Sequence, residues 1–236
     1  MNLFDKYFLT ARAFPILVFA MPFILIAYFV LGFSLDYKLA LSSVFVIAII
    51  YFIALNNREW GKKLEKRLFL KWEGKPTNIL LRESNSTIVD VEKKEIKSLL
   101  EKYTGYSLPT TKQEKEDVEK ADETYELYSK YLRNETRDKN KFPVIFDELT
   151  NYGAVRNLLA LKRMAIFLLS ILVGVLALYA HIKDWKPDKG IYIGLSIALV
   201  SIIIWCGITE SKLKNHAFRY AKNLLDSTKH IKNRLL

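Results

Sequence analysis

The stretch YLRNETRDKNKFPVIFDELTNYGAVRNLLALKR, residues 131–163, runs directly into MAIFLLSILVGVLALYA, residues 164–180. The first part is rich in arginine, carboxylate and amide side chains, whereas the second contains no charged residue. An α-helix rises about 1.5 Å per residue and the hydrocarbon core of a bilayer is about 30 Å thick, so an apolar run of this length comes close to spanning it. The stretch therefore joins a water-facing segment to a predicted membrane span.

Three further runs without a charge occur at residues 14–33, 39–55 and 190–209. The shorter runs end in aromatic and lysine residues, whose long side chains extend a span into the interface. A soluble protein would have to bury four such runs in a chain of only 236 residues. The sequence therefore predicts an all-α integral membrane protein with four transmembrane helices.

The predicted organisation has two membrane hairpins around a mainly helical cytoplasmic domain, followed by a basic amphipathic helix. The first apolar run is too long for a cleaved signal peptide, so we expect it to remain as a span. The predicted segments are a first hairpin at 1–56 (spans at about 14–33 and 39–55), the cytoplasmic domain at 57–163, a second hairpin at 164–209 (spans at about 164–182 and 190–209) and the C-terminal helix at 210–236.

Basic residues flanking the spans indicate their orientation, because such residues accumulate on the cytoplasmic side. Residues 58–75 hold seven basic and three acidic side chains, and residues 211–236 hold seven basic and one acidic. We therefore expect both termini and the central domain to be cytoplasmic. The net charge of +11 fits basic belts that face anionic lipid. Nucleic-acid binding would also fit this charge, but no recognised motif supports it.

Cysteine and histidine give no sign of a metal or redox centre. Cys206 is the single cysteine, which excludes an internal disulfide framework and a cysteine zinc cluster. The three histidines, His181, His216 and His230, are too scattered in the sequence to indicate a metal site. We predict no cofactor.

Several local patterns predict helices within the cytoplasmic domain. Apolar residues recur every four positions from Trp60 to Trp72, which indicates a helix that continues span two or lies at the interface. Gly74 and Pro76 should interrupt it. Asp90 is expected to cap the next helix, and Thr111 with Glu114 is expected to form a capping box. A further helix should begin at Val144 or Asp147 and run into span three.

The candidate functional residues cluster around the junction with span three. On one helix, Glu148, Asn151 or Tyr152, and Arg156 share a face. Guanidinium groups bind phosphate in a bidentate manner, so this face is suited to a nucleotide, a cyclic-nucleotide signal or a lipid headgroup. The alternative is a network of ion pairs that locks the domain to span three. The candidates for ligand or interface contacts are Arg133, Arg137, Asp138, Glu148, Asn151, Tyr152, Arg156 and Asn157.

Two features of the predicted spans bear on function. Gly190, Gly194 and Ala198 form a ridge of small residues that lets helices approach closely, either within one subunit or between copies. None of the spans has an ionisable residue at its middle, which argues against a proton-coupled pump. No catalytic nucleophile–base pair or carboxylate dyad is recognisable from spacing, so we do not expect an enzyme. The C-terminal helix has one apolar side, which suits a membrane surface or a partner helix.

Three segments, GKKLEKRLFLKWEGKPTNILLR (61–82), YLRNETRDKNKF (131–142) and NYGAVRNLLALK (151–162), together resemble an uncharacterised family of small bacterial proteins with two membrane hairpins around a cytoplasmic insert. The family pattern has an aromatic residue and a basic residue where this chain has Ala154 and Val155. The resemblance implies a bacterial inner (cytoplasmic) membrane and supplies no activity.

The leading functional hypothesis is a homo-oligomer whose cytoplasmic domain senses a signal or partner and then alters membrane permeability. Proteins of this shape resemble membrane-perturbing, channel-like effectors of bacterial antiviral defence, which is an analogy of architecture alone. Possible partners are the bilayer, further copies of the chain, a soluble protein and a small phosphate-containing signal. The alternatives are a non-conducting scaffold that anchors a soluble partner and, third, a membrane enzyme that acts on lipid headgroups.

Overall fold

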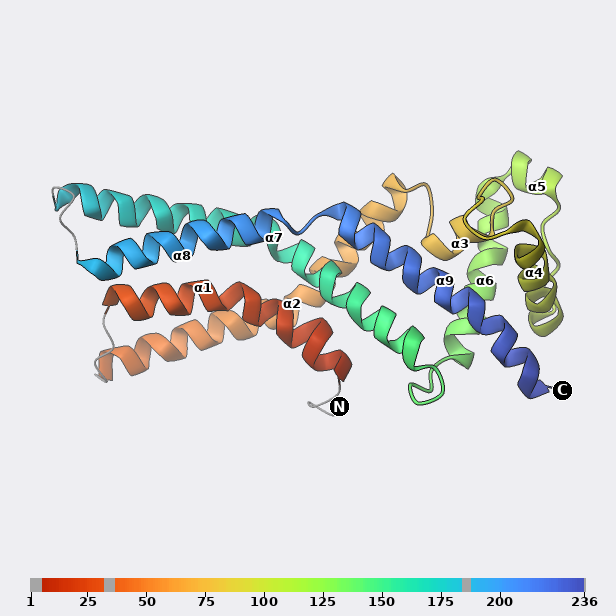
Figure 1. Cartoon of the computed structure of the whole chain (residues 1–236), viewed down its shortest axis with the longest axis horizontal. Coiled ribbons are helices and arrows are strands. Elements are labelled where there is room, and N and C mark those ends of the chain that lie inside the picture. The colour runs from red at the N-terminus through yellow and green to blue at the C-terminus, as the bar shows by residue number, and fades with distance from the viewer. Residues whose placement is uncertain (1–5, 32–36, 184–187, 236) are drawn as a thin grey trace. The chain divides into compact units, whose positions relative to one another are not determined.

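The structure is a computed structural model, and it describes residues 6–31, 37–183 and 188–235, without the side chains of 31, 37–50, 54 and 232–235. All regular structure in these ranges is helical, as predicted (Figure 1). Three helices in them are long and apolar enough to cross a membrane, namely Phe8–Val30, Pro143–Ile182 and Lys189–Cys206. The second predicted span, 39–55, lies largely outside the described side chains and stays a prediction.

The chain divides into two compact units. Unit 1 comprises residues 1–64 and 153–213, and unit 2 comprises residues 65–152 and 214–236. The division falls within three helices, α2 (Tyr37–Lys71), α7 (Pro143–Ile182) and α9 (Glu210–Leu235), each of which has residues in both units. The C-terminal helix therefore belongs mostly with the central domain and is not a segment by itself.

Unit 1 begins with a π-helical segment, η1 (Phe8–Ala13), that continues into α1 (Phe14–Leu31). The π-helical register widens the helix locally and is often found at functional sites. The Asn157 side chain donates a hydrogen bond to the carbonyl of Ala11 at 2.6 Å, so α7 supplies a partner within this segment. Ala11 is fully buried there.

The small-residue ridge of α8 (Lys189–Cys206) lies against α1, and Figure 1 shows these two helices side by side. A Cβ atom at Gly190 would lie 2.0 Å from the carbonyl oxygen of Phe29, and one at Gly194 would lie 2.9 Å from a methyl of Val30. Ala198, the third member of the ridge, is fully buried. Of the two predicted uses of the ridge, the structure shows packing within one subunit.

Helices α1 and α7 both contact the C-terminal end of α8. The Trp205 ring packs edge-on against Phe19 of α1, with ring centroids 6.4 Å apart. Lys162 of α7 donates to the carbonyls of Cys206 and Ile208, at 3.1 and 2.7 Å. The last carbonyls of a helix have no partner within it, and a lysine placed there satisfies them and complements the helix dipole.

Unit 2 is a bundle of amphipathic helices around one core. It adds α3 (Pro76–Leu81), α4 (Asp90–Thr104), α5 (Thr111–Glu116) and α6 (Val118–Glu135) to the unit 2 portions of α2, α7 and α9. The apolar side of the C-terminal helix, which was predicted to contact a membrane surface or a partner helix, packs into this core. The buried core residues are Leu80, Leu81, Ile88, Ile96, Leu100, Ala121, Tyr125, Tyr128, Leu132, Phe142, Ile145, Ala221, Leu224, Leu225 and Ile231.

The turn after α2 confirms the predicted interruption. Glu73 and Gly74 have φ angles of 62° and 150°, and Pro76 then opens α3 at a position where proline is favoured. A Cβ at position 74 would also lie 2.7 Å from the Arg82 guanidinium, which would have to shift. This reversal brings Arg82 towards the end of α2.

Two predicted caps lie one residue away from their observed positions. Helix α4 begins at Asp90, but its N-cap residue is Val89. The capping box of α5 consists of Thr110 and Gln113, because the Thr110 hydroxyl accepts from the Gln113 amide at 3.2 Å and the Gln113 carboxamide accepts from the Thr110 amide at 2.9 Å. Glu114 is consequently not a cap, and it enters the interior of unit 2.

Candidate functional site

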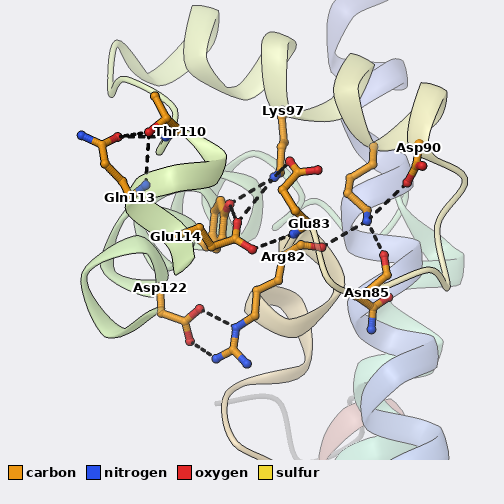
Figure 2. Close-up of polar contacts among 11 residues, drawn as sticks. Arg82, Glu83, Asn85, Asp90, Lys97, Thr110, Gln113, Glu114 and Asp122 are labelled. Atoms are coloured by element: carbon orange, nitrogen blue, oxygen red, sulfur yellow. Dashed lines mark hydrogen bonds and ion pairs between the residues drawn. The ribbon is translucent and has the colours of Figure 1, made fainter. Parts of the chain in front are cut away.

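The most strongly organised polar group in unit 2 is a pair between α6 and the end of α3. The Arg82 guanidinium donates to both carboxylate oxygens of Asp122, at 3.0 and 2.8 Å, and also to the carbonyl of Glu73 at 2.7 Å (Figure 2). A bidentate pair of this kind fixes orientation as well as distance. Asn78 adds a bond to the backbone carbonyl of Asp122 at 3.2 Å. Arg82 thereby fastens the turn after α2 to α6.

A second polar chain runs deeper, and Lys97 of α4 is at its centre. The Lys97 side chain, 4 % exposed, donates to Glu83 at 2.5 Å and to the Tyr125 hydroxyl at 3.1 Å. Tyr125 in turn donates to Glu114 at 2.5 Å, and Glu114 also accepts the backbone amide of Glu83 at 2.7 Å (Figure 2). Each buried charge therefore has a partner, as the cost of desolvating it requires.

These contacts shift the protonation equilibria of the groups in the chain. The hydrogen bond from Lys97 holds the pKa of Glu83 below its usual range. Burial and the adjacent Glu114 carboxylate raise the pKa of Tyr125, so this phenol stays protonated and acts as a hydrogen-bond donor. Burial, with a smaller effect of Glu101, likewise raises the pKa of Tyr128 to about 12.

A second buried lysine of α4 supports the loop that carries Arg82 and Glu83. Lys93, only 1 % exposed, donates to the carbonyls of Arg82, at 3.1 Å, and of Asn85. It also lies 3.8 Å from Asp90 on its own helix (Figure 2). These bonds hold the loop between α3 and α4 against α4. They thereby fix the position of the Arg82–Asp122 pair.

A cleft of about 1000 Å³ opens beside this network. Its lining combines charged groups with apolar side chains, of which Leu70 is 81 % exposed. Five of the lining residues are acidic and three are basic, so the cleft is more acidic than the chain as a whole. The charged residues that line it are Glu73, Lys75, Arg82, Glu83, Glu114, Lys115, Glu119 and Asp122.

The charged residues of the cleft differ in how far they are already paired. Its innermost charges, Arg82, Asp122 and Glu114, already pair with one another or with their neighbours, whereas Glu73 and Glu119 are exposed at the surface. Among the described residues, no three His, Cys, Asp or Glu side chains gather as metal ligands would. Acidic groups beside an exposed leucine favour a ligand that has both a cationic and an apolar part.

The predicted residues at the end of α6 are engaged locally. Arg133 pairs with Glu126 at 2.8 Å, and Arg137 donates to Asn134 at 2.8 Å. Asp138 accepts the backbone amides of Asn140 and Lys141, and these bonds hold its pKa below the usual range. Arg137 and Asp138 therefore shape the exposed turn that precedes α7, whereas Arg133 pairs within α6.

Further along, the predicted residues of α7 in unit 2 pack against α9. Glu148, 7 % exposed, accepts from Arg219 at 2.6 Å. Tyr152 stacks on Tyr220, with ring centroids 6.4 Å apart and an interplanar angle of 3°. Asn151 is exposed. The contacts of Glu148 and Tyr152 thus join α7 to α9, while their predicted role in ligand binding and the alternative, an ion-pair network that locks the domain to span three, stay predictions.

The last two predicted residues, Arg156 and Asn157, belong to unit 1. Arg156 donates to the Asn157 carboxamide at 3.4 Å, and Asn157 bonds to Ala11 as described above. A Cβ atom on Gly61 of α2 would lie 2.4 Å from the same carboxamide oxygen, so α2 approaches α7 closely here. Asn157 thus connects three elements of unit 1 and lines the cavity considered below.

Sequence reasoning missed the network around Lys97, although α4 carried a signal for it. Lys93, Ile96, Lys97 and Leu100 follow the spacing of one helical face, so two lysines occupy the apolar stripe. A lysine on a buried face requires an anionic or carbonyl partner. Its partners, Glu83 and Glu114, come from separate segments, and no local spacing connects them.

Comparison with known proteins assigns no family. No protein-family model, curated protein or solved structure matches the chain. The resemblance given by residues 61–82, 131–142 and 151–162 stays a prediction.

Proposed function

We propose that the chain is a membrane-embedded sensor, in which unit 2 binds a soluble partner through its acidic cleft and unit 1 changes the permeability of a bacterial inner membrane in response. The single observation that carries the proposal is the course of α7. This helix begins at Pro143, contributes Ile145 to the core of unit 2 and continues without interruption to Ile182 through a membrane-length apolar stretch. A continuous helix transmits displacement because its backbone hydrogen bonds resist bending.

The cleft favours a cationic partner over an anionic signal. Five acidic residues against three basic ones line it, and the guanidinium of Arg82 already donates to both carboxylate oxygens of Asp122 and to the carbonyl of Glu73. Rim charges such as Glu73 and Glu119 steer association and select against partners of like charge. The partner class is therefore a soluble protein that presents a lysine- or arginine-rich segment with apolar side chains.

Binding is tested with hexalysine as the probe and the purified full chain in detergent. Glu73→Lys and Glu119→Lys together should weaken binding by about tenfold or more, because each reversal replaces an attraction by a repulsion. Glu116→Lys is the matched control, since Glu116 is exposed and does not line this cleft. Equal affinity in wild type, the double variant and the control would contradict a role for the cleft.

Permeability is tested in vesicles of phosphatidylethanolamine and phosphatidylglycerol that carry a potassium gradient. We expect ion flux in vesicles containing the chain after addition of a soluble bacterial protein fraction, and reduced flux with the cleft double variant. Vesicles that remain ion-tight with and without this fraction would contradict the permeability change.

The second candidate function is a non-conducting scaffold that anchors the same partner. One observation favours it: α1 occupies the ridge of Gly190, Gly194 and Ala198, so that ridge is not free for self-association. Hexalysine binding that depends on the cleft, combined with ion-tight vesicles and a monomeric mass in nanodiscs, would favour the scaffold. A homo-oligomer of defined mass would favour the sensor.

A further inference from the structure

A second cavity, of about 700 Å³, lies within unit 1 and is formed by η1, α1, α2 and α7. Most of its lining is apolar and comes from η1, α1 and α2. Ligand sites of this size typically combine an apolar surface with a few placed polar groups. The apolar lining residues are Phe8, Ala13, Ile16, Leu17, Ala20, Ile24 and Leu55, together with the ring of Tyr51.

The polar side chains that line this cavity come from η1, from residues 57–59 of α2 and from α7. Arg12 and Arg58 contribute cations, and Asn57 and Asn157 contribute amides. The remaining charged residue, Glu59, pairs with Lys62 at 3.0 Å and is therefore partly neutralised. The cavity has an apolar body and a basic end.

Asn57 is the observation that points to a ligand. Its side chain is 2 % exposed and lines the cavity, yet neither its nitrogen nor its oxygen has a hydrogen-bond partner in the described part of the chain. Buried polar groups are nearly always satisfied, so such an amide signals a missing partner. Asn157, the other amide of the cavity, is by contrast engaged by Ala11 and Arg156.

We propose that this cavity binds one anionic phospholipid of the surrounding bilayer. An acyl chain lies along Ile16, Leu17 and Ile24, and the phosphate group lies near Arg12 and Arg58, within reach of the Asn57 amide. A lipid fits better than free phosphate because most of the lining is apolar and would gain nothing from a small hydrophilic anion. Basic pockets between membrane helices are established sites for anionic headgroups.

The inference does not depend on the proposed sensing activity, because it concerns unit 1 alone. It predicts a stoichiometric lipid that survives purification, whatever unit 2 binds. The direct measurement is native mass spectrometry of the full chain in detergent after reconstitution with phosphatidylglycerol or phosphatidylcholine. We expect one retained phosphatidylglycerol per chain and no retained phosphatidylcholine. Equal retention of the two lipids would overturn the headgroup assignment.

The apolar part of the site is tested by filling it. Leu17 is 57 % exposed and lines the cavity, so Leu17→Trp should block the acyl chain without disturbing the buried core. Met21 is 42 % exposed on the same helix and does not line the cavity, which makes Met21→Trp the matched control. Retention of phosphatidylglycerol should fall only in Leu17→Trp. Unchanged retention in that variant would overturn the location of the site.

The basic end is tested by removing its charges. Arg12→Gln and Arg58→Gln should each weaken phosphatidylglycerol binding by about fivefold, which is the contribution typical of one basic residue near anionic lipid. Arg67→Gln, on an exposed position of α2 outside the cavity, removes the same charge and should have no such effect. A uniform decrease in all three variants would indicate a general attraction to anionic surfaces and would overturn the site.

The variant Asn57→Leu separates a ligand role from a structural one. Since the amide has no partner within the protein, we expect the melting temperature of the lipid-free chain to stay equal or rise, while the stabilisation by phosphatidylglycerol decreases. Inorganic phosphate, added in place of lipid, should not stabilise either form. A lower melting temperature with unchanged lipid stabilisation, or stabilisation by inorganic phosphate alone, would overturn the proposal.

Discussion

Units 1 and 2 both consist of packed helices, but different residue patterns determine which helix faces are buried in each. In unit 2 each amphipathic helix buries one apolar stripe, and charges that enter the interior, such as Lys97, have fixed partners. In unit 1 the membrane-length stretches of α1, α7 and α8 are predominantly apolar, and large residues including Phe167 and Ile203 remain 64 % and 70 % exposed. In water, the solvent determines which face is buried. In a membrane, close fitting of small residues determines it.

The largest loss of stability is expected from substitutions in α9, the part of unit 2 that is most distant in sequence from its other helices. Leu224 and Leu225 of α9 are fully buried in the core, so replacing both with alanine should lower the free energy of unfolding of this unit by about 5 kcal/mol. Thermal unfolding and protease resistance of the purified chain would measure this change. The control is Lys222→Ala, at an exposed position of the same helix. A double variant that melts with the wild type would contradict the inclusion of α9 in this core.

The interior charge of unit 2 should have the next largest effect. Lys97→Met leaves Glu83 and the buried Glu114 without their cation, and breaking such a buried pair costs about 3 kcal/mol. The pKa of Glu83 is lowered by Lys97, so the part of this stabilisation that Glu83 contributes is present above the usual glutamate pKa of 4.5 and is lost as the pH falls through the folded-state pKa. Solvent screening reduces this part, because the Glu83 side chain is 36 % exposed. Chemical denaturation at pH 7 and pH 3 would measure both parts.

Lys94→Met is the control for this change, because Lys94 is exposed on the same helix. It should leave stability nearly unchanged at both pH values. If Lys97→Met were as stable as this control at pH 7, the network around Lys97 would not contribute to the stability of unit 2.

In unit 1 the corresponding test concerns backbone approach. Gly190→Ala places a methyl group 2.0 Å from the Phe29 carbonyl oxygen, so α8 must move away from α1, at a cost of about 2 kcal/mol. Gly174→Ala is the matched control, since no heavy atom lies within 4 Å of the Cβ built there. Thermal unfolding in detergent should show a lower melting temperature only for Gly190→Ala. Equal melting temperatures would mean that this ridge does not hold α8 to α1.

The smallest expected effect is a gain in stability. Asp226 of α9 has a buried carboxylate oxygen without a hydrogen-bond partner, and burial, together with Glu92, raises its pKa above the usual 3.8. The folded state therefore binds its proton more tightly than the unfolded state, so the charged carboxylate costs stability at neutral pH. Asp226→Asn should stabilise unit 2 by about 1 kcal/mol at pH 7.

That gain should disappear as the pH falls below 3.8, because the carboxyl group is then neutral in both states. Denaturation curves across this pH range would show it. A stabilisation that is independent of pH would assign the effect to packing and not to charge.

The sequence predicted the helical class and the stretches that carry it, because hydropathy and helical spacing are local properties. It predicted three membrane-length helices that the structure contains, and the break at Gly74. It also predicted a helix that begins at Val144 or Asp147 and runs into the third span, which the structure contains as α7 (Pro143–Ile182). It also placed an amphipathic helix at the C-terminus, but the partner of this helix depends on residues over 100 positions away, such as Glu92, which pairs with Lys229 at 2.6 Å.

The candidate site was less predictable for the same physical reason. Arg133, Arg137 and Asp138 form a dense local cluster in the sequence, yet each is satisfied by neighbours within seven residues. The organised network instead joins Arg82 to Asp122 and Lys97 to Glu83 across loops, and loop closure is not encoded in any short spacing. The buried lysines of α4 were the one local signal that pointed to it.

We propose that α7 passes from water into the bilayer as one helix. Spin labels placed singly at Val144, Asn151, Phe167, Ile171 and Val175 in a Cys206→Ser background test it directly, because all five positions are exposed in the structure. In nanodiscs, we expect the labels at Val144 and Asn151 to collide with a water-soluble relaxant. We expect the other three labels to collide with oxygen dissolved in lipid. Access of the water-soluble relaxant to Phe167, Ile171 and Val175 would contradict it and would place α7 in a soluble bundle.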